Sequence, residues 1–469
     1  MKLKKIISAV ISAVIMTSFV SVPVFAEVTV ENENQFTDSI VLYEKVKNGV
    51  KVVKCDSSIK ELKIQSKANG YDVIEIDEKA FSDNKSLQSV SIPNSVKTIG
   101  KYAFSNCSSL ESVELPNNIT EIPEGIFVNC QYLTDVEIPD SVTVVGMGAF
   151  MNCFSLSELD LPDSIISLED YALNNCYSIK SLELPANLEN IGPLALGGLY
   201  SLTELKIDSR NDSFKIQDDI LYDSDMKTLY LSTNIQMTGS VSIPDSVTSI
   251  EGYAFSGCSD ITEVTIPASV LQIGDDAFSY CTSLKNINFS EGLESIGNYA
   301  FQYDSSIESV SLPTTLKKIG VGAFANNTSL SSAIIPEGVN TIGSASFFNC
   351  TSLNKISLPS TIQTIGEYAL GYIANSDSSD AVLKSDFTMS IFSNTPAKDY
   401  VKANNINYDS VDFNLKSVIF IVLCAVIIII VIAFAIRIMK KSKPAEIPEK
   451  DNPDDGYKSI IDDSDDLEN

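Results

Sequence analysis

The sequence predicts an α/β repeat solenoid that is mostly β and carries one C-terminal transmembrane helix. Three observations predict this fold class. A 23-residue pattern recurs along most of the 469-residue chain, each copy is too small to bury its own apolar residues, and a long apolar run stands near the C-terminus. Such units bury a continuous core only when they stack side by side.

A proline marks each repeat. Every copy approximates the template [IL]-P-x-x-[VIL]-x-x-I-G-x-x-A-F-x-x-C-x-S-L-x-x-[VIL]-x, and Ser290 takes the proline position once. The register survives this substitution and a longer gap after Pro185. The prolines in register are Pro93, Pro116, Pro139, Pro162, Pro185, Pro244, Pro267, Pro313, Pro336 and Pro359.

The template also predicts the path of each coil. Residues before the proline alternate in polarity, as in Leu110, Val113 and Leu115, which is typical of a strand. Stacked coils would pair these strands into a parallel sheet, and the proline would end each strand because it has no N–H to donate. Gly100 and its equivalents would turn the chain, and the Ala-Phe pair would place a buried column of rings on the far side. These rings are Phe104, Phe127, Phe150, Phe255, Phe278, Phe301, Phe324 and Phe347.

The repeats fall into two blocks, residues 70–207 and 241–373. Residues 208–240 contain short apolar runs about a turn and predict a β-hairpin-like insert that decorates the junction. Residues 27–69 are expected to cap the first coil, and residues 374–412 to form a C-terminal cap and juxtamembrane segment.

The two ends carry membrane signals. Residues 1–26 combine a basic start, an apolar run and a cleavage site after Ala26, as in a secretory signal peptide. Residues 417–437 are apolar almost throughout and long enough to span a membrane as a helix. Basic residues on its C-terminal side place the disordered acidic tail, 438–469, in the cytoplasm. We expect a single-pass plasma-membrane protein with extracellular repeats, and the lysine-rich signal peptide favours a Gram-positive bacterium.

Composition restricts the chemistry. The formal charge of −28 opposes binding to nucleic acid. The chain contains no histidine, which excludes Ser-His-Asp and Cys-His nucleophile pairs and His-ligated zinc. No carboxylate pair stands out from the repeats, so a glycosidase has no specific support. We therefore predict a protein that is not an enzyme, with no catalytic residue, metal, cofactor or small-molecule substrate.

Seven of the nine cysteines occupy one position of the repeat. Side chains in one column point the same way and do not pair easily, which favours small buried thiols; disulfides or zinc ligation remain the alternatives. Asp304 and Asn327 take the position in two copies. The column comprises Cys107, Cys130, Cys153, Cys176, Cys258, Cys281 and Cys350.

The segment IPDSVTSIEGYAFSGCSDITEVTIP, residues 243–267, resembles the repeat consensus of the BspA-like (Treponema-type) leucine-rich repeat proteins. The resemblance covers about residues 70–373. It implies a right-handed curved leucine-rich repeat solenoid, secretion, surface display, and binding to other macromolecules rather than catalysis.

Positions beside the buried strand residue should point outward from the predicted sheet. In the first block many of them are acidic, whereas in the second block they are nearly neutral. Like charges on adjacent strands repel unless a cation or a basic partner screens them. This acidic ribbon is our candidate ligand-binding site; the alternative is the general acidity of the chain. It comprises Glu114, Asp135, Glu137, Glu158, Asp160, Glu183 and Glu204.

The function predicted from these features is adhesin-like binding at the cell surface. The partner would be an extracellular protein, matrix component or glycan, and the acidic ribbon favours a basic one. The single span would anchor the protein in the membrane. The alternative is a receptor-like or cell-envelope scaffold that signals through its cytoplasmic tail. Repeat surfaces are general scaffolds, so the sequence does not name the ligand.

Overall fold

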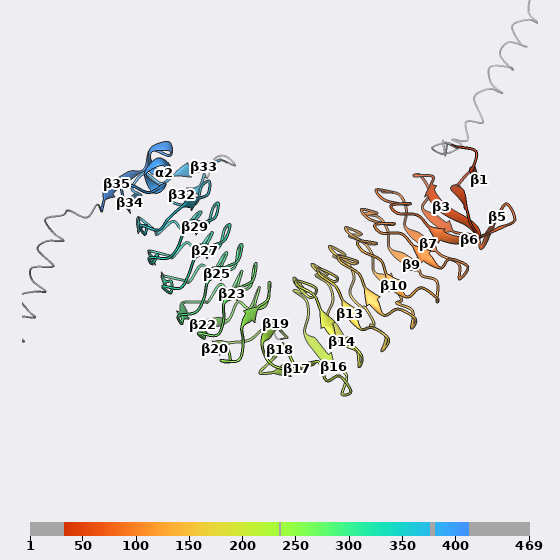
Figure 1. The fold of residues 1–469 in the computed structure, drawn as a ribbon, viewed down its shortest axis with the longest axis horizontal. Helices are drawn as coiled ribbons and strands as arrows, with labels where there is room; N and C mark the ends of the chain where they lie inside the picture. The colour runs from red at the N-terminus through yellow and green to blue at the C-terminus, as the bar shows by residue number, and fades with distance from the viewer. Residues whose placement is uncertain (1–31, 234–235, 376–379, 412–469) are drawn as a thin grey trace, which may run out of the picture. The chain divides into compact units, whose positions relative to one another are not determined.

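The computed structural model describes residues 32–233, 236–375 and 380–411, which belong to one compact unit. Coil follows coil along the chain (Figure 1). Most 23-residue coils contribute one strand to a first parallel ladder, and each contributes a two-residue strand to a second ladder. Partners in both ladders are one repeat apart, as in Val113 opposite Val136 and Ile273 opposite Ile296.

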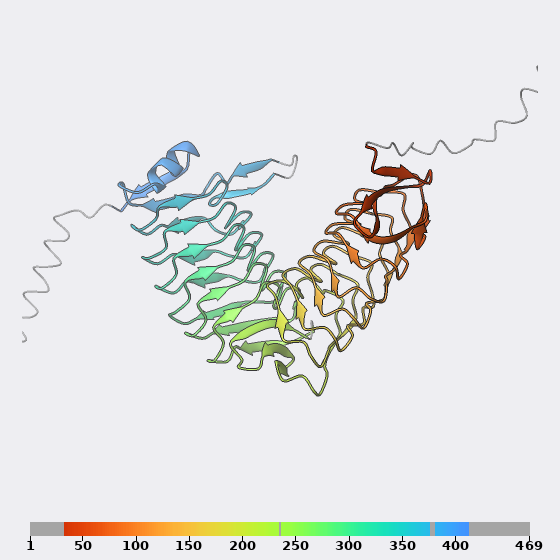
Figure 2. The same cartoon turned by 45° about the vertical axis from the view of Figure 1, so that its right-hand side comes forward.

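The first ladder runs along the face on which the strand arrows follow one another in Figure 2. It begins before the first block with β4 (Glu61–Lys63). In the first block its strands are β7 (Ser89–Ser91), β9 (Ser112–Glu114), β11 (Asp135–Val136), β14 (Ser181–Leu184) and β16 (Glu204–Ile207). In the second block they are β20 (Gly239–Ser242), β22 (Ile261–Ile266), β24 (Asn286–Phe289), β26 (Ser309–Ser311), β28 (Ser332–Ile334) and β30 (Lys355–Ser357).

The second ladder holds the residues just before the Ile-Gly turn. In the first block its strands are β8 (Thr98–Ile99), β10 (Glu121–Ile122), β12 (Val144–Val145), β13 (Ser167–Leu168) and β15 (Asn190–Ile191). In the second block they are β21 (Ser249–Ile250), β23 (Gln272–Ile273), β25 (Ser295–Ile296), β27 (Lys318–Ile319), β29 (Thr341–Ile342) and β31 (Thr364–Ile365).

Additional elements cover both ends of the array. At the N-terminal end, β3 pairs with β2 on one side and with β6 on the other. At the C-terminal end, β34 continues the first ladder from β30, and β35 lies at its edge. The elements are β1 (Gln35–Thr37), β2 (Val41–Val46), β3 (Gly49–Cys55), β5 (Lys67–Ala68), β6 (Tyr71–Ile76), β32 (Tyr372–Ala374), β33 (Ala381–Leu383), β34 (Thr388–Ile391), α2 (Ala397–Ala403) and β35 (Asn407–Ser410).

The predicted fold class needs correction. The described residues form a mostly-β solenoid with one seven-residue helix, α2, and not an α/β solenoid with a transmembrane helix. None of the described helices is long and apolar enough to cross a membrane. The apolar run at 417–437, the signal sequence at 1–26 and the tail at 438–469 lie outside the described residues.

The coils lack helices for a backbone reason. Each coil has two residues with positive φ, four positions apart, on either side of the Ala-Phe pair: Tyr102 and Asn106 in one coil, Tyr253 and Gly257 in another. A left-handed residue ends a right-handed helix, so the chain returns through turns.

The Phe column is buried as predicted. Its rings stack on one another, with centroids 5.0 Å apart for Phe255 and Phe278 and 5.2 Å apart for Phe278 and Phe301. All eight predicted rings are at most 1% exposed. The seven Cys side chains of the column are also buried and free of disulfides. The Cys130 thiol donates to the Phe104 carbonyl over 3.1 Å, and five other column thiols make the equivalent bond.

The insert joins the cores of the two blocks. Its strands β17 (Phe214–Gln217), β18 (Ile220–Asp223) and β19 (Thr228–Ser232) form an antiparallel meander, and β19 then pairs in parallel with β21. Leu221 of β18 packs in the core of the first block, whereas its neighbours Ile220 and Tyr222 pack in the core of the second. Both faces of β18 are therefore buried, and the insert is a layer of the core rather than a surface decoration.

Asp304, which takes a Cys position in the column, places a carboxyl group in the buried core. Its Oδ1 accepts the Cys281 backbone N–H over 2.7 Å, but its Oδ2 is buried and has no hydrogen-bond partner among the described residues. Burial raises the pKa of Asp304 well above its usual value, and the Cys281 hydrogen bond opposes this only in part. The fold therefore favours the protonated acid.

Phe278→Ala should lower the free energy of unfolding by about 3–5 kcal/mol, because it leaves a cavity between two stacked rings. Denaturant unfolding measures the change. Tyr132→Ala, which truncates a ring that is 62% exposed, is the control and should change it by less than about 0.5 kcal/mol. A loss below 1 kcal/mol for Phe278→Ala would contradict the stacked core.

Asp304→Asn should remove a pH dependence of stability. The folded protein holds the Asp304 proton more tightly than the unfolded chain, so this residue favours folding below about pH 4. That contribution falls by about 1.4 kcal/mol per pH unit as the pH rises toward the pKa in the folded state. Urea unfolding from pH 4 to 8 should show wild type losing stability relative to the variant. Parallel profiles would show that Asp304 does not titrate in this way.

Candidate functional site

The first ladder presents the acidic ribbon on its outer surface. In β9 the middle residue Val113 is buried, and its neighbours Ser112 and Glu114 face outward. The same alternation in β14 buries Leu182 and exposes Glu183. All seven predicted ribbon residues are exposed, as the strand period requires.

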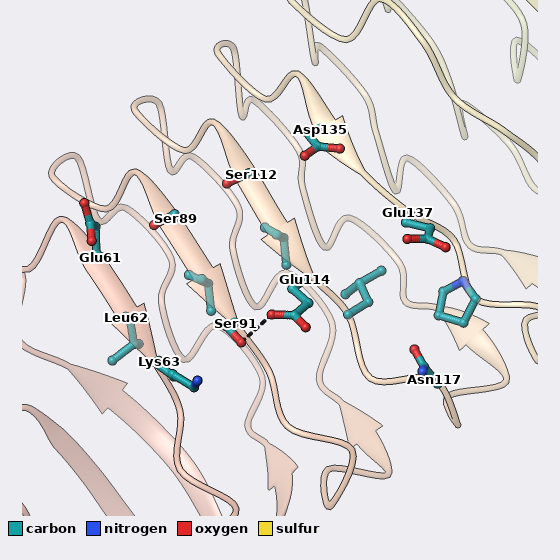
Figure 3. A pocket seen from close by; sticks show the side chains of 14 residues that line it. Glu61, Leu62, Lys63, Ser89, Ser91, Ser112, Glu114, Asn117, Asp135 and Glu137 are labelled. Carbon is teal, nitrogen blue, oxygen red and sulfur yellow. Dashed lines mark hydrogen bonds between the residues drawn. The ribbon is translucent and has the colours of Figure 1, made fainter.

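Three ribbon residues, Glu114, Asp135 and Glu137, line an open hollow of about 740 Å³ (Figure 3). The Ser91 hydroxyl donates to Glu114 Oε2 over 2.6 Å, so this carboxylate already has one partner. Lys63 is the one basic side chain of the lining. The hollow is therefore acidic, polar and open to solvent.

Three more ribbon residues, Glu158, Asp160 and Glu183, line a second hollow of about 520 Å³ with Lys180. An ion-pair network stands at its edge. Arg210 Nη2 lies 2.8 Å from Asp163 Oδ2 and 2.8 Å from Asp208 Oδ2. Hydrogen bonds from the Arg210 side chain and backbone lower the pKa of Asp208 to about 2.

Glu204 does not belong with the other six. Its Oε1 lies 2.7 Å from Lys206 Nζ, and its Oε2 accepts a hydrogen bond from Ser181. The hydrogen bond from Lys206 lowers the pKa of Glu204. Glu204 lines neither hollow, so the structure places it at the end of the ribbon with its charge already paired.

The ladder is interrupted where the ribbon is most acidic. Asp135 and Glu137 precede Glu158 and Asp160 by one repeat, so two successive coils carry acidic residues at both outward positions. Residues 158–160 form no strand, although β11 before them and β14 after them do. Repulsion between carboxylates at adjacent strand positions opposes pairing there, but the ladder is also broken between β24 and β26, where the outward residues are uncharged.

Five carboxylates, those of Asp135, Glu137, Glu158, Asp160 and Glu183, make no side-chain hydrogen bond or ion pair with any described residue. All seven ribbon residues are exposed, but only these five lack such an interaction, and ligand binding at the ribbon stays a prediction. Nowhere in the described ranges do three acidic or Cys side chains come together as a metal site.

Three basic residues at the ribbon, Lys63, Lys180 and Arg210, were missed by the sequence reasoning. Lys63 and Lys180 are ordinary surface residues in the sequence, and nothing in their spacing marks them. Arg210 carries a signal that was available, since the chain has one other arginine and Arg210 stands just after the last coil of the first block.

The strand face of the second block is different. Ser309, Ser311, Ser332 and Ser357 face outward there, and Ile334 is an exposed apolar side chain among them. Glu263, the acidic residue of β22, accepts hydrogen bonds from Ser240 and Asn288. The two blocks therefore offer chemically distinct surfaces, one acidic and one neutral.

Solved structures resemble this fold. A leucine rich cell surface protein from Faecalibacterium prausnitzii is 27% identical, with a TM-score of 0.59, over 75% of this chain and all of that one. The pneumococcal vaccine antigen PcpA is 20% identical, with a TM-score of 0.58, over 81% of this chain and 99% of that one. No curated protein matches the chain significantly.

A family model described as the BspA type leucine rich repeat region matches the chain in overlapping segments, 52–157, 121–242, 237–337 and 322–408. Together these segments span most of the chain and include both caps in part. The chain therefore belongs to the BspA type leucine-rich repeat family.

Proposed function

We propose that this protein is displayed at the cell surface and binds a protein partner through the strand face of its first block. The observation that carries the proposal is the set of five unpaired carboxylates at two open hollows on that face. Membership of a leucine-rich repeat family supports protein binding, and the cell-surface description of the Faecalibacterium protein supports the location.

The charge of the face indicates the chemistry of the partner. Carboxylates that lack a partner within the protein are satisfied best by lysine or arginine side chains of another molecule. An extended basic segment could follow successive coils, because equivalent positions recur at each strand spacing along the ladder. The partner is thus a host-cell, matrix or neighbouring-cell protein with a basic segment, and the protein acts as an adhesin rather than as an enzyme.

The open form of the hollows also favours a macromolecule. Both are shallow surfaces beside strands, lined mainly by Ser, Asp and Glu. Small-molecule sites usually enclose most of the ligand and are largely apolar. In the part of the chain that the structure describes, stacked Phe and Cys side chains are buried in the interior of the solenoid.

The triple substitution Glu137→Gln, Glu158→Gln and Asp160→Asn should weaken binding of a basic protein ligand about tenfold, since each exposed ion pair contributes about 0.2–1 kcal/mol. The measurement is binding of the full chain to an array of matrix proteins and glycans, followed by titration of the proteins that bind. Affinity should also fall with added salt.

A matched variant, Glu121→Gln, Asp140→Asn and Glu189→Gln, removes three exposed carboxylates that lie outside both hollows. It should bind as wild type does. Equal losses in both variants would show that net charge alone attracts the ligand, and unchanged affinity in the first variant would exclude the ribbon as the binding surface.

A further inference from the structure

A second surface lies away from the strand face, on the turns that connect the second ladder to the first. Six aromatic rings, which we call the aromatic ridge, come together there from both blocks. Ring centroids are 4.8 Å apart for Phe154 and Tyr177 and 5.3 Å apart for Tyr177 and Tyr200. The ridge comprises Phe154, Tyr177, Tyr200, Tyr253, Tyr280 and Tyr303.

The ridge crosses the junction between the blocks. Tyr200, in the last coil of the first block, meets Tyr253, in the first coil of the second, edge to face at 6.5 Å. Tyr280 and Tyr303 stack at 4.6 Å in the following two coils. The ridge thus brings together residues that the insert separates in the sequence.

The ridge differs from the buried Phe column in its exposure. Tyr177, Tyr200, Tyr280 and Tyr303 are 36–46% exposed, whereas the stacked rings of the Phe column are almost completely buried. Exposed aromatic rings that gather in one patch are typical of binding surfaces rather than of isolated surface residues. Tyrosine is also enriched among the residues that contribute most to protein interfaces.

A carboxylate takes the place of a tyrosine next to these rings, since Asp276 occupies the repeat position of Tyr253 in the following coil. Asp276 is half-buried and has Asp275 as its charged neighbour in sequence, and the Ser279 hydroxyl donates to the Asp276 backbone carbonyl over 3.0 Å. Asp275 itself is occupied, because both of its oxygens accept hydrogen bonds from Asn298. The Asp276 charge acts on four rings of the ridge: Tyr177, Tyr200, Tyr253 and Tyr280.

No cation compensates this carboxylate. Within the described residues, no lysine or arginine is among the groups that influence Asp276 or these four tyrosines. Burial, followed by the Asp275 charge, raises the pKa of Asp276 to about 6. A surface with aromatic faces next to an uncompensated anion therefore lacks one component, a cation that can lie against the rings.

We propose that the aromatic ridge is a second docking surface, which takes an arginine-bearing segment of a protein partner. Arginine fits both parts of the surface, because its planar guanidinium stacks on aromatic rings and donates hydrogen bonds to a carboxylate. The row of rings along successive coils provides contact for the residues that flank the arginine. This surface is separate from the acidic ribbon and does not depend on the function proposed for it.

A neutral glycan is the other ligand that an exposed row of rings could stack. The Asp276 carboxylate favours the cation, since a neutral sugar would leave its charge uncompensated. The two ligands also differ in pH dependence. Guanidinium binding should strengthen as Asp276 ionises, with most of the increase near pH 6.

The test uses the full chain and three probes: a tetra-arginine peptide, a tetra-lysine peptide of equal charge, and the neutral sugar maltohexaose. Tetra-arginine should bind more tightly than tetra-lysine. Tyr177→Ala with Tyr200→Ala should weaken tetra-arginine binding about tenfold. Asp276→Asn should also weaken it and should abolish the increase in affinity between pH 5 and 7.

Tyr132→Ala is the matched control, since it removes one exposed tyrosine ring that is not part of the ridge. Thermal unfolding checks that each variant is folded. The ribbon variant Glu137→Gln, Glu158→Gln, Asp160→Asn should retain the preference for arginine over lysine. The proposal is overturned by equal affinities for the two peptides, by a ridge variant that binds as the control does, or by ridge-dependent binding of maltohexaose alone.

Discussion

The structure depends on one constraint, the close approach of each coil to the next in a fixed 23-residue register. At the Ile-Gly turn, a Cβ on Gly100 or Gly320 would overlap the backbone of the preceding coil. The same spacing lets each strand hydrogen-bond to its equivalent and lets rings stack about 5 Å apart. A single coil can neither complete its backbone hydrogen bonds nor bury its apolar side chains. The register between coils therefore determines which residues lie in the core and which lie on the outer surface.

The register also aligns equivalent surface side chains of successive coils in rows. A carboxylate at one outward position in several copies becomes a row, and a serine becomes a neutral strip. This explains how two blocks with the same buried template present an acidic face and a neutral face. At the interruption at residues 158–160, successive copies carry acidic residues at both outward positions. The variable positions of the repeat thus determine the surface chemistry, while the recurring apolar positions hold the coils together.

The features that depend on the repeat period could be predicted from the sequence. The Phe and Cys columns, the outward position of the ribbon and the parallel strands all follow from one template. Sequence reasoning failed where the template does not apply. The α/β class was wrong for the described coils, because positive φ at residues such as Tyr102 and Asn106 returns the chain through turns. The aromatic ridge was missed because its members occupy unlike repeat positions: Tyr177 follows a column Cys, whereas Tyr280 precedes one. The repeat period does not predict individual side-chain contacts. The contacts across the insert and the pairing of Glu204 with Lys206 are examples.

The two-sided burial of β18 has a consequence for cooperativity. In a linear array each unit feels only its neighbours, so an ordinary surface insertion would separate the blocks into two independently melting segments. Here Leu221 and Tyr222, adjacent in the sequence, pack in opposite cores. Unfolding of one block therefore removes packing contacts of the other through β18, and the insert couples the unfolding of the two blocks.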